Sequence, residues 1–354
     1  ITSSAASDVY KRQHVGRKMK RVKLSKPGGL QNLMLEESTI PEPNDNQVLI
    51  RVMSSSLNYH DLLVALGGIP VADGRIVLSD CAGEIVKCGP NVKIWQKGDR
   101  VISCCYPHWR SGPPNPKLLS FIGDNEDGYA TEYIAISETS ITRAPSNWTQ
   151  SESATLPCAA LTAWHALIER GNLKPNQTVL TLGSGGVSLF AIQFAKSMGA
   201  KVISTSSSEV KCNKLKEMGA DEVINYNEHK QWGKEVLRLT DGEGVDHVIE
   251  VGGGMTLNES IRSTKFGGHL ALIGVLTGPS VSDIVLPRVF MKQINISGIA
   301  MANRESQQRM VDYLDTCNFR PIISDYFQLE ELSSAFQHQL EKKHFGKISI
   351  SINS

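Results

Sequence analysis

The sequence predicts an α/β protein in which a β-rich first half precedes a doubly wound parallel sheet. Two observations indicate this fold. From Thr178 onward, six short apolar runs alternate with segments of helical periodicity, as expected for strands that crossover helices bury on both faces. Before about residue 155, short candidate strands are separated by Pro- and Gly-rich turns instead. The six strands predicted for the parallel sheet are Thr178–Leu182, Lys201–Thr205, Glu222–Asn225, Val245–Val251, His269–Val275 and Ile294–Ile299.

The first half is expected to contain mostly strands. Period-two alternation or apolar runs predict strands at Met19–Leu24, Leu33–Ser38, Gln47–Ser54, Cys81–Cys88 and Tyr129–Ile136. Helical spacing occurs at Leu57–Leu66 and at Ser153–Glu169, which contains Pro157. The Pro/Gly-rich segment His108–Gly128 is too polar for a core, and we expect a surface lobe or a cleft-lining loop there.

The chain end changes pattern again. After about Ala302 we expect helices at Glu305–Thr316 and Leu329–Lys342 and a last strand at Lys347–Ile352, which return to the first domain. The predicted division is therefore 19–155 for the first domain, 156–302 for the parallel-sheet domain and 303–354 for the return. Residues 1–18 are expected to be a non-native extension, with a disordered polar extension as the alternative. Ser3–Gln13 resembles the translation of a sequencing-library adapter, and Met19 looks like the natural start.

Composition excludes several classes of protein. A formal net charge of +1 gives no electrostatic case for binding nucleic acid or an anionic membrane. No apolar run reaches the roughly 18 residues of a membrane span, and no secretory signal is visible. Seven cysteines at irregular spacing do not suggest a disulfide framework. We therefore expect a cytoplasmic protein.

The segment Gln177–Ala200 predicts a nucleotide site, because it shows a strand, a glycine turn and a helix. Gly183, Gly185, Gly186 and Val187 form the turn, at which free N–H groups of the helix start would face a pyrophosphate. The dinucleotide fingerprint G-x-G-x-x-G is incomplete, since Ser188 stands at the third glycine position. A tight turn that uses glycine only for geometry is the alternative.

The end of the second strand favours NADPH over NADH. An NAD site usually has an Asp or Glu there for the ribose hydroxyls. This chain has Ser206, Ser207 and Ser208, with Lys211 close behind. Hydroxyls and a cation suit a 2′-phosphate, which a carboxylate would repel. The serines also fit an ordinary polar loop before a helix.

Five stretches carry a family resemblance: Leu57–Asp61, Ala82–Val86, Lys97–Val101, Leu156–Ala163 and Leu182–Val187. In combination they resemble the medium-chain dehydrogenase/reductase superfamily over Met19 to Asn353. The resemblance implies a GroES-like catalytic domain, a Rossmann domain and a cleft between them. It also implies a homodimer, for which the edge strand Ile294–Ile299 is the candidate contact.

The chain departs from the zinc alcohol dehydrogenases of this superfamily. Their first cysteine ligand aligns with Asn58, and their Gly-His-Glu motif reads Ser79-Asp80-Cys81 here. Only Cys158 fills a ligand position, whereas an open zinc site needs three protein ligands. The region Cys104–Gly128 also lacks the spaced cysteines of a structural zinc lobe. We expect no metal ion.

The stretch from Leu57 to Tyr59 is similar to that of the zinc-less quinone and enone reductases. The Asn58 amide and the Tyr59 hydroxyl would donate hydrogen bonds to a substrate oxygen. His60 occupies the proton-relay position and could deliver a proton, although it could also be a surface or capping residue. Asp61 is expected to hold this helix start or to orient its neighbours.

The resemblance implies further contacts with the cofactor. Thr162 would pack on the nicotinamide, and the backbone at Gly252 and Gly274 would approach the cofactor. Arg304 and Lys347 are cations that could reach its phosphates, although either could simply be solvated at the surface.

The predicted function is a zinc-independent, NADPH-preferring oxidoreductase. It would transfer hydride between the nicotinamide and a small carbonyl compound or an activated alkene, such as an enone or quinone. One alternative is an alcohol dehydrogenase assisted by a metal at Asp80 and Cys158. Another is a non-catalytic NADPH-binding sensor.

Overall fold

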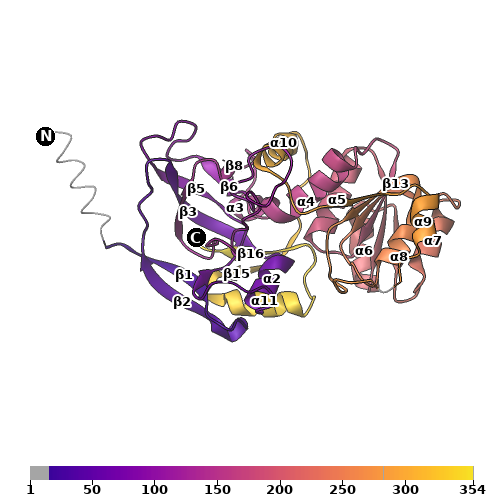
Figure 1. Cartoon of the computed structure of the whole chain (residues 1–354), viewed down its shortest axis with the longest axis horizontal. Helices are drawn as coiled ribbons and strands as arrows, with labels where there is room; N and C mark the ends of the chain where they lie inside the picture. The colour runs from indigo at the N-terminus through magenta and orange to yellow at the C-terminus, as the bar shows by residue number, and fades with distance from the viewer. Residues whose placement is uncertain (1–15, 282, 354) are drawn as a thin grey trace. The chain divides into compact units, whose positions relative to one another are not determined.

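The computed structural model describes residues 16–281 and 283–353, and the chain forms two compact units (Figure 1). One unit comprises the chain up to Cys158 together with Asn303–Thr316 and Ile323–Ser354. The other comprises Ala159–Ala302 and Cys317–Ile322. The adapter-like segment Ser3–Gln13 lies outside the described residues. Within the described part of the chain, none of the helices has the length and apolar character that crossing a lipid bilayer requires.

The first unit contains two sheets. A three-stranded sheet has the order β2-β1-β4, and a seven-stranded sheet has the order β15-β16-β3-β5-β6-β8, with β7 paired to β3. The strands are β1 (Lys18–Leu24), β2 (Leu33–Thr39), β3 (Gln47–Ser56), β4 (Arg75–Ile76), β5 (Ala82–Cys88), β6 (Arg100–Ser103), β7 (Tyr133–Ser137), β8 (Ile141–Arg143), β15 (Ile323–Gln328) and β16 (Lys347–Ser351). The helices are η1 (Leu30–Asn32), α2 (Tyr59–Ala65), α3 (Gln150–Ser153), α10 (Arg304–Leu314), η4 (Leu329–Glu331) and α11 (Leu332–Leu340), and the π turn η2 (Leu156–Ala160) follows α3.

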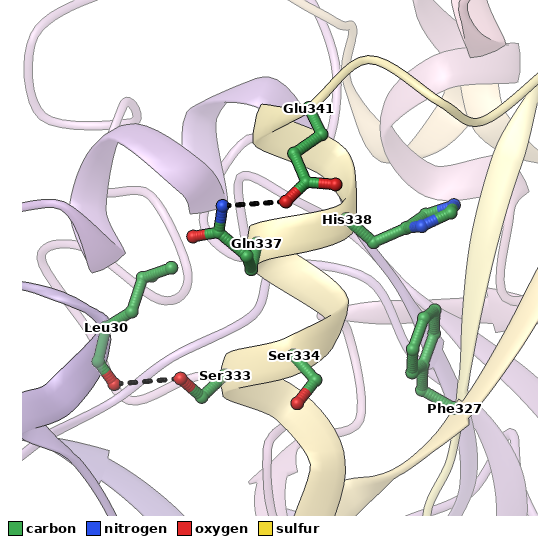
Figure 2. A pocket seen from close by; sticks show the side chains of 7 residues that line it. All are labelled: Leu30, Phe327, Ser333, Ser334, Gln337, His338 and Glu341. Carbon is green, nitrogen blue, oxygen red and sulfur yellow. Dashed lines mark hydrogen bonds between the residues drawn. The ribbon is translucent and has the colours of Figure 1, made fainter.

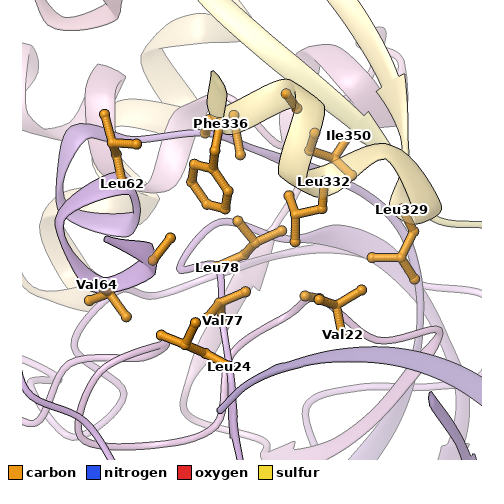
Figure 3. Packing of buried hydrophobic residues seen from close by; sticks show 14 of the residues in the cluster. Val22, Leu24, Leu62, Val64, Val77, Leu78, Leu329, Leu332, Phe336 and Ile350 are labelled. Atoms are coloured by element: carbon orange, nitrogen blue, oxygen red, sulfur yellow. The ribbon is translucent and has the colours of Figure 1, made fainter. Parts of the chain in front are cut away.

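A hydrophobic cluster joins the two ends of the chain inside the first unit (Figure 3). Phe336 of α11 lies among apolar side chains that include Leu62 of α2 and Leu78, and all three are almost completely buried. Truncating a buried phenylalanine of this kind costs about 3–5 kcal/mol. Because α11 packs on α2 (Figure 1), this cluster fixes the helix whose first turn carries Asn58.

The second unit contains a six-stranded sheet in the order β11-β10-β9-β12-β13-β14, with every described pair parallel. Its strands are β9 (Thr178–Leu182), β10 (Lys201–Ser206), β11 (Glu222–Asn225), β12 (Val245–Glu250), β13 (Thr264–Leu272) and β14 (Asn295–Gly298). Its helical segments are α4 (Leu161–Trp164), η3 (His165–Arg170), α5 (Gly186–Ser197), α6 (Glu209–Glu217), α7 (Trp232–Leu239), α8 (Leu257–Ser263) and α9 (Leu286–Met291). The predicted doubly wound parallel sheet is confirmed.

Three predictions about local structure differ from the fold. The helix expected at Ser153–Glu169 is divided into α3, η2, α4 and η3, because Pro157 has no N–H for a helical hydrogen bond. The lobe from 108 to 128 is not purely polar, since Trp109, Phe121 and Ile122 are buried in it. Strand β15, which contains Asp325 and has alternating half-buried and exposed residues, was not predicted.

Candidate active site

Asn58 is the N-cap of α2, and only 6% of its surface is exposed. Its backbone N–H donates to Asp61 Oδ2 at 3.0 Å. Its side-chain Oδ1 accepts a hydrogen bond from Lys347 Nζ at 2.5 Å, while Nδ2 donates to Ser79 Oγ at 3.3 Å. An ammonium can bond only to the oxygen of the amide, so Lys347 fixes which way the amide points. The amide N–H groups of Asn58 also hydrogen-bond the carboxylate of Asp80, which acts to lower the pKa of that carboxyl group.

Lys347, on β16, is buried rather than free to reach a phosphate. Its Nζ donates to the backbone oxygen of Leu57 at 2.7 Å and to Asn58 Oδ1, and it lies 3.5 Å from Asp80 Oδ2. Three acceptors thus surround an ammonium that has three N–H bonds. Arg304 does not point to a phosphate either, because its Nε donates to the backbone oxygen of Ile141 at 2.7 Å.

Asp80 is completely buried and lies at the centre of a polar cluster that also contains Asn58 and Lys347. Its Oδ2 accepts from Ser56 Oγ at 2.6 Å, and its Oδ1 accepts from the backbone N–H of Cys158 at 3.1 Å. Cys158 lies in the π turn η2. Burial raises the pKa of Asp80, and the positive charge of Lys347 opposes this rise.

Asp61 is a second buried carboxyl group beside the first. Burial and the nearby Asp80 raise the pKa of Asp61 to about 7, although hydrogen bonding to Ser79 and the charge of Lys347 act in the opposite direction. Two carboxyl groups therefore share one ammonium. The cluster can hold a proton near neutral pH.

His60 is connected to the lobe at 108–128. Its Nε2 lies 3.3 Å from Asp124 Oδ2, and its ring contacts that of Phe121 with the centroids 4.3 Å apart. Burial lowers the pKa of His60, whereas the carboxylate of Asp124 acts to raise it. Tyr59, the neighbouring residue, is 39% exposed at the start of α2. The structure thus brings His60 to an acidic partner and leaves Tyr59 at the surface.

Tyr106 is a half-buried hydroxyl group that sequence analysis did not select. Its ring packs edge-on against Phe121. Burial raises the pKa of Tyr106 to about 12, and Cys105, Cys158 and Asp124 add to the rise, which places Tyr106 near the cluster around Asp80. Only its position after two cysteines could have drawn attention to it.

The glycine turn after β9 has open space next to the Cα atoms of Gly183 and Gly185. Gly183 has a φ of +72°, and a Cβ atom at Gly183 or Gly185 would meet no atom within 4 Å. Helix α5 begins at Gly186 and continues through Val187. Ser188, at the third glycine position, is buried, and its Oγ donates to the backbone oxygen of Leu182 at 2.6 Å. Ser188 therefore ties the helix to the strand end at the position where the fingerprint has a glycine.

Serines and a lysine lie at the end of β10. Ser206 is buried and Ser207 is exposed, while Ser208 Oγ accepts from the backbone N–H of Lys211 at 3.3 Å. Burial and the positive charge of Lys214 lower the pKa of Lys211. No carboxylate lies in the strand end itself, so this end suits an anionic group.

Glu250, which sequence analysis missed, organises the loop after β12. Its Oε1 accepts from the backbone N–H groups of Gly252 and Gly253 at 2.7 and 2.9 Å and from Thr256 Oγ1 at 2.6 Å. A Cβ atom at Gly252 would lie 2.2 Å from Thr256 Oγ1, and one at Gly274 would lie 2.4 Å from a backbone oxygen. Both glycines are thus required by packing. Thr162, in α4, is buried.

Two surface hollows contain none of the predicted site residues. One, of about 430 Å³, lies beside α11 (Figure 2). Its polar groups pair within the protein, because Ser333 Oγ donates to the backbone oxygen of Leu30 and Gln337 Nε2 donates to Glu341. The other, of about 610 Å³, includes His247 and His269 on the parallel sheet. We therefore assign the reaction to neither hollow.

Comparisons with known proteins cover nearly the whole chain. A zinc-binding dehydrogenase model matches residues 186–316, and an alcohol dehydrogenase GroES-like domain model matches residues 44–146. The chain is 35% identical to a zinc-type alcohol dehydrogenase-like protein of Schizosaccharomyces pombe, over 92% of this chain and 96% of that protein. It is 28% identical to an acryloyl-coenzyme A reductase of Sulfurisphaera tokodaii, over 92% and 98% of the two chains. A solved NAD-dependent alcohol dehydrogenase superposes with a TM-score of 0.86 at 28% identity, over 95% of this chain and 100% of that one.

Proposed function

Because the chain belongs to the medium-chain dehydrogenase/reductase superfamily and is an NAD(P)-dependent oxidoreductase, we propose that it is an NADPH-preferring reductase that works without a metal ion. Its substrate would be a small carbonyl compound or an activated alkene whose double bond is conjugated to a carbonyl group. The bound nicotinamide would supply the hydride. The protein would bind the substrate oxygen and deliver the proton.

The observation that carries the proposal is the hydrogen bonding of the Asn58 side chain. Lys347 binds the amide oxygen at 2.5 Å and thereby polarises the amide group, which strengthens its N–H bonds as donors. Negative charge develops on the carbonyl oxygen during hydride addition. The Asn58 amide would exchange one of its hydrogen bonds to the protein for one to that oxygen, in the role of an oxyanion-hole donor. Tyr59 remains the proposed second donor.

The proton would come from the first turn of α2. His60 and its partner Asp124 form an acid-base pair, and His60 directly precedes Asp61 in the first turn of α2. A proton held by His60 would be replaced from solvent, because the side chain is about one third exposed. This arrangement is a proton relay that needs no metal-bound water.

The residues at the family's zinc positions do not fit a zinc ion. Zinc requires at least three thiolate, imidazole or carboxylate ligands. Asn58 supplies an amide, and the carboxylate of Asp80 already binds Ser56, Cys158 and Lys347. A zinc ion would also meet the positive charge of Lys347. Within residues 16–281 and 283–353, no group of three His, Cys, Asp or Glu side chains is arranged to hold a metal.

Three features support a nicotinamide cofactor, and two of them, at the end of β10, favour NADPH over NADH. The strand end carries the buried Ser206 and the exposed Ser207 and no carboxylate, and Lys211 follows in the first turn of α6. The open turn at Gly183 and Gly185 leaves space for a pyrophosphate. The residues present therefore fit the cofactor with its 2′-phosphate better than they fit NADH.

The oligomer that we propose is a homodimer. Strand β14 is an edge of its sheet, and α9 directly precedes it with Leu286, Phe290 and Met291 each more than 60% exposed. An apolar surface next to an unpaired edge strand suits burial by a second copy. Light scattering of the purified chain would measure the mass. We also propose the cytoplasm as its compartment, because none of the seven cysteines forms a disulfide in the structure.

A variant at Asn58 tests the proposed reaction. Asn58→Asp keeps an oxygen that accepts from Lys347 but removes the N–H donor, and we expect a fall in kcat of about 10²-fold or more with NADPH and an enone. NADPH affinity, measured by fluorescence titration, should change little. An unchanged kcat would show that Asn58 takes no part in the reaction.

Two other outcomes would favour the alternative functions. Turnover of primary alcohols alone, dependent on added zinc, would favour a metal-assisted alcohol dehydrogenase instead. Tight NADPH binding without turnover of any carbonyl compound or alkene would favour a sensor.

A further inference from the structure

Two cysteines converge on the carboxylate of Asp80 from separate parts of the first unit. The backbone N–H of Cys158 donates to Asp80 Oδ1 at 3.1 Å, and the Sγ atom of Cys105 lies 4.0 Å from the same oxygen. Cys105 follows β6, whereas Cys158 lies in the π turn η2. The two thiol groups also hydrogen-bond each other. They are therefore neighbours in space although they lie 53 positions apart in the chain.

The two thiols differ in their access to solvent. Cys105 is 1% exposed, whereas Cys158 is partly exposed. Hydrogen bonding to Cys158 and burial raise the pKa of Cys105 well above its usual range. A dissolved oxidant can reach Cys158 but not Cys105. This is the arrangement of a reacting thiol beside a resolving thiol.

We propose that Cys158 and Cys105 form a site of reversible oxidation, in which a hydroperoxide converts the two thiols to a disulfide. In the first step the sulfur of Cys158 attacks the hydroperoxide ROOH, which gives a sulfenic acid and the alcohol ROH. In the second step the sulfur of Cys105 attacks the sulfenic sulfur, the S–O bond breaks, and the hydroxide leaves as water with the proton of Cys105. Two thiols are oxidised and one hydroperoxide is reduced, so atoms and electrons balance.

The cross-link would disturb the active site. A disulfide requires an S–S distance of about 2.05 Å, which is much shorter than a contact between two thiols. The π turn η2 would have to shift toward Cys105, and this shift would break the hydrogen bond from Cys158 to Asp80. Asp80 is joined through Lys347 to Asn58. The expected loss of activity rests on the proposed function, whereas the oxidation itself does not.

The test uses the full-length protein and hydrogen peroxide. After treatment, intact mass spectrometry should show the loss of two hydrogens, and peptide mapping should join the peptides of Cys105 and Cys158. A thiol reductant should restore the original mass. The matched control is Cys104→Ala, since Cys104 is the adjacent buried thiol and contacts Gln307 instead. This variant should cross-link as the parent protein does.

The variant Cys105→Ala removes the resolving thiol. We expect its Cys158 to proceed to the sulfinic acid, which a thiol reductant does not reverse. Its thermal unfolding curve, recorded before treatment, shows whether the variant is folded. Oxidation of the parent protein to a sulfinic acid without a cross-link would overturn the proposal, and so would a disulfide between other cysteines. A cross-link in a protein that lacks reductase activity would refute the proposed function and leave this inference intact.

Discussion

The substitution Lys347→Met removes the buried ammonium and keeps most of the side-chain length. Three buried acceptors then lose their donor, namely the backbone oxygen of Leu57, Asn58 Oδ1 and the carboxylate of Asp80. Because Lys347 and Asp80 are both almost completely buried, the carboxylate would be left as an uncompensated charge. Breaking a buried ion pair in this way costs about 3–5 kcal/mol. We expect a loss of that size in the free energy of unfolding of the first unit, measured by urea denaturation.

The matched control is the double variant Lys347→Met with Asp80→Asn. Removing the charge of Asp80 removes most of the penalty, so the double variant should recover about 1–3 kcal/mol relative to the sum of the two single effects. Because the chain has two compact units, unfolding curves from tryptophan fluorescence and from circular dichroism should be shown to coincide before a two-state analysis is used. If Lys347→Met lowers the free energy of unfolding by less than about 1 kcal/mol, and if the effects of the two substitutions simply add, then Lys347 and Asp80 do not form a stabilising buried ion pair.

Two further predictions concern the pH dependence and the cofactor. Asp61 has a pKa of about 7 in the folded protein, and about 3.9 is usual in an unfolded chain. The folded state therefore binds more protons between these values, and stability should fall by up to about 4 kcal/mol as pH rises from 4 to 7 and then level off. Asp61→Asn should flatten this slope in urea titrations, and parallel curves for the two proteins would contradict the assignment. Ser206→Asp should raise the Kd of NADPH more than that of NADH in fluorescence titrations, because a carboxylate repels the 2′-phosphate. An equal change in the two Kd values would show that the end of β10 does not select for the 2′-phosphate.

The parallel sheet was predictable because its signal is local. Strands buried on both faces are mostly apolar, and the inner strand β9 has the predicted bounds. The edge strand β11 also has the predicted bounds. Strand β15 was not predicted, because an edge strand needs only one apolar face and Asp325 interrupts the alternation of apolar and polar residues. Pro157 was noticed, but its effect depends on how the neighbouring backbone groups find other partners. The N–H of Cys158, for example, bonds to Asp80.

The site was predictable only in part. Resemblance to a family directed attention to Asn58, and chemistry indicated an N–H donor. The partner of its oxygen could not be predicted, since Lys347 lies 289 residues away and its sequence neighbours suggest only a strand. A lysine near a chain end is usually exposed, so the sequence suggested a phosphate ligand. Similarly, nothing in the local pattern joins Cys105 to Cys158 or assigns four hydrogen bonds to Glu250.

Metal content and turnover, measured on one sample of purified protein, test the central claim most directly. The sample would be analysed for zinc by mass spectrometry and then assayed with NADPH and an enone, before and after dialysis against a chelator. We predict zinc far below one ion per chain and the same kcat before and after dialysis. Zinc at one ion per chain, with activity lost on dialysis and restored by added zinc, would contradict the claim that Asn58 and Lys347 stabilise the substrate oxygen without a metal ion.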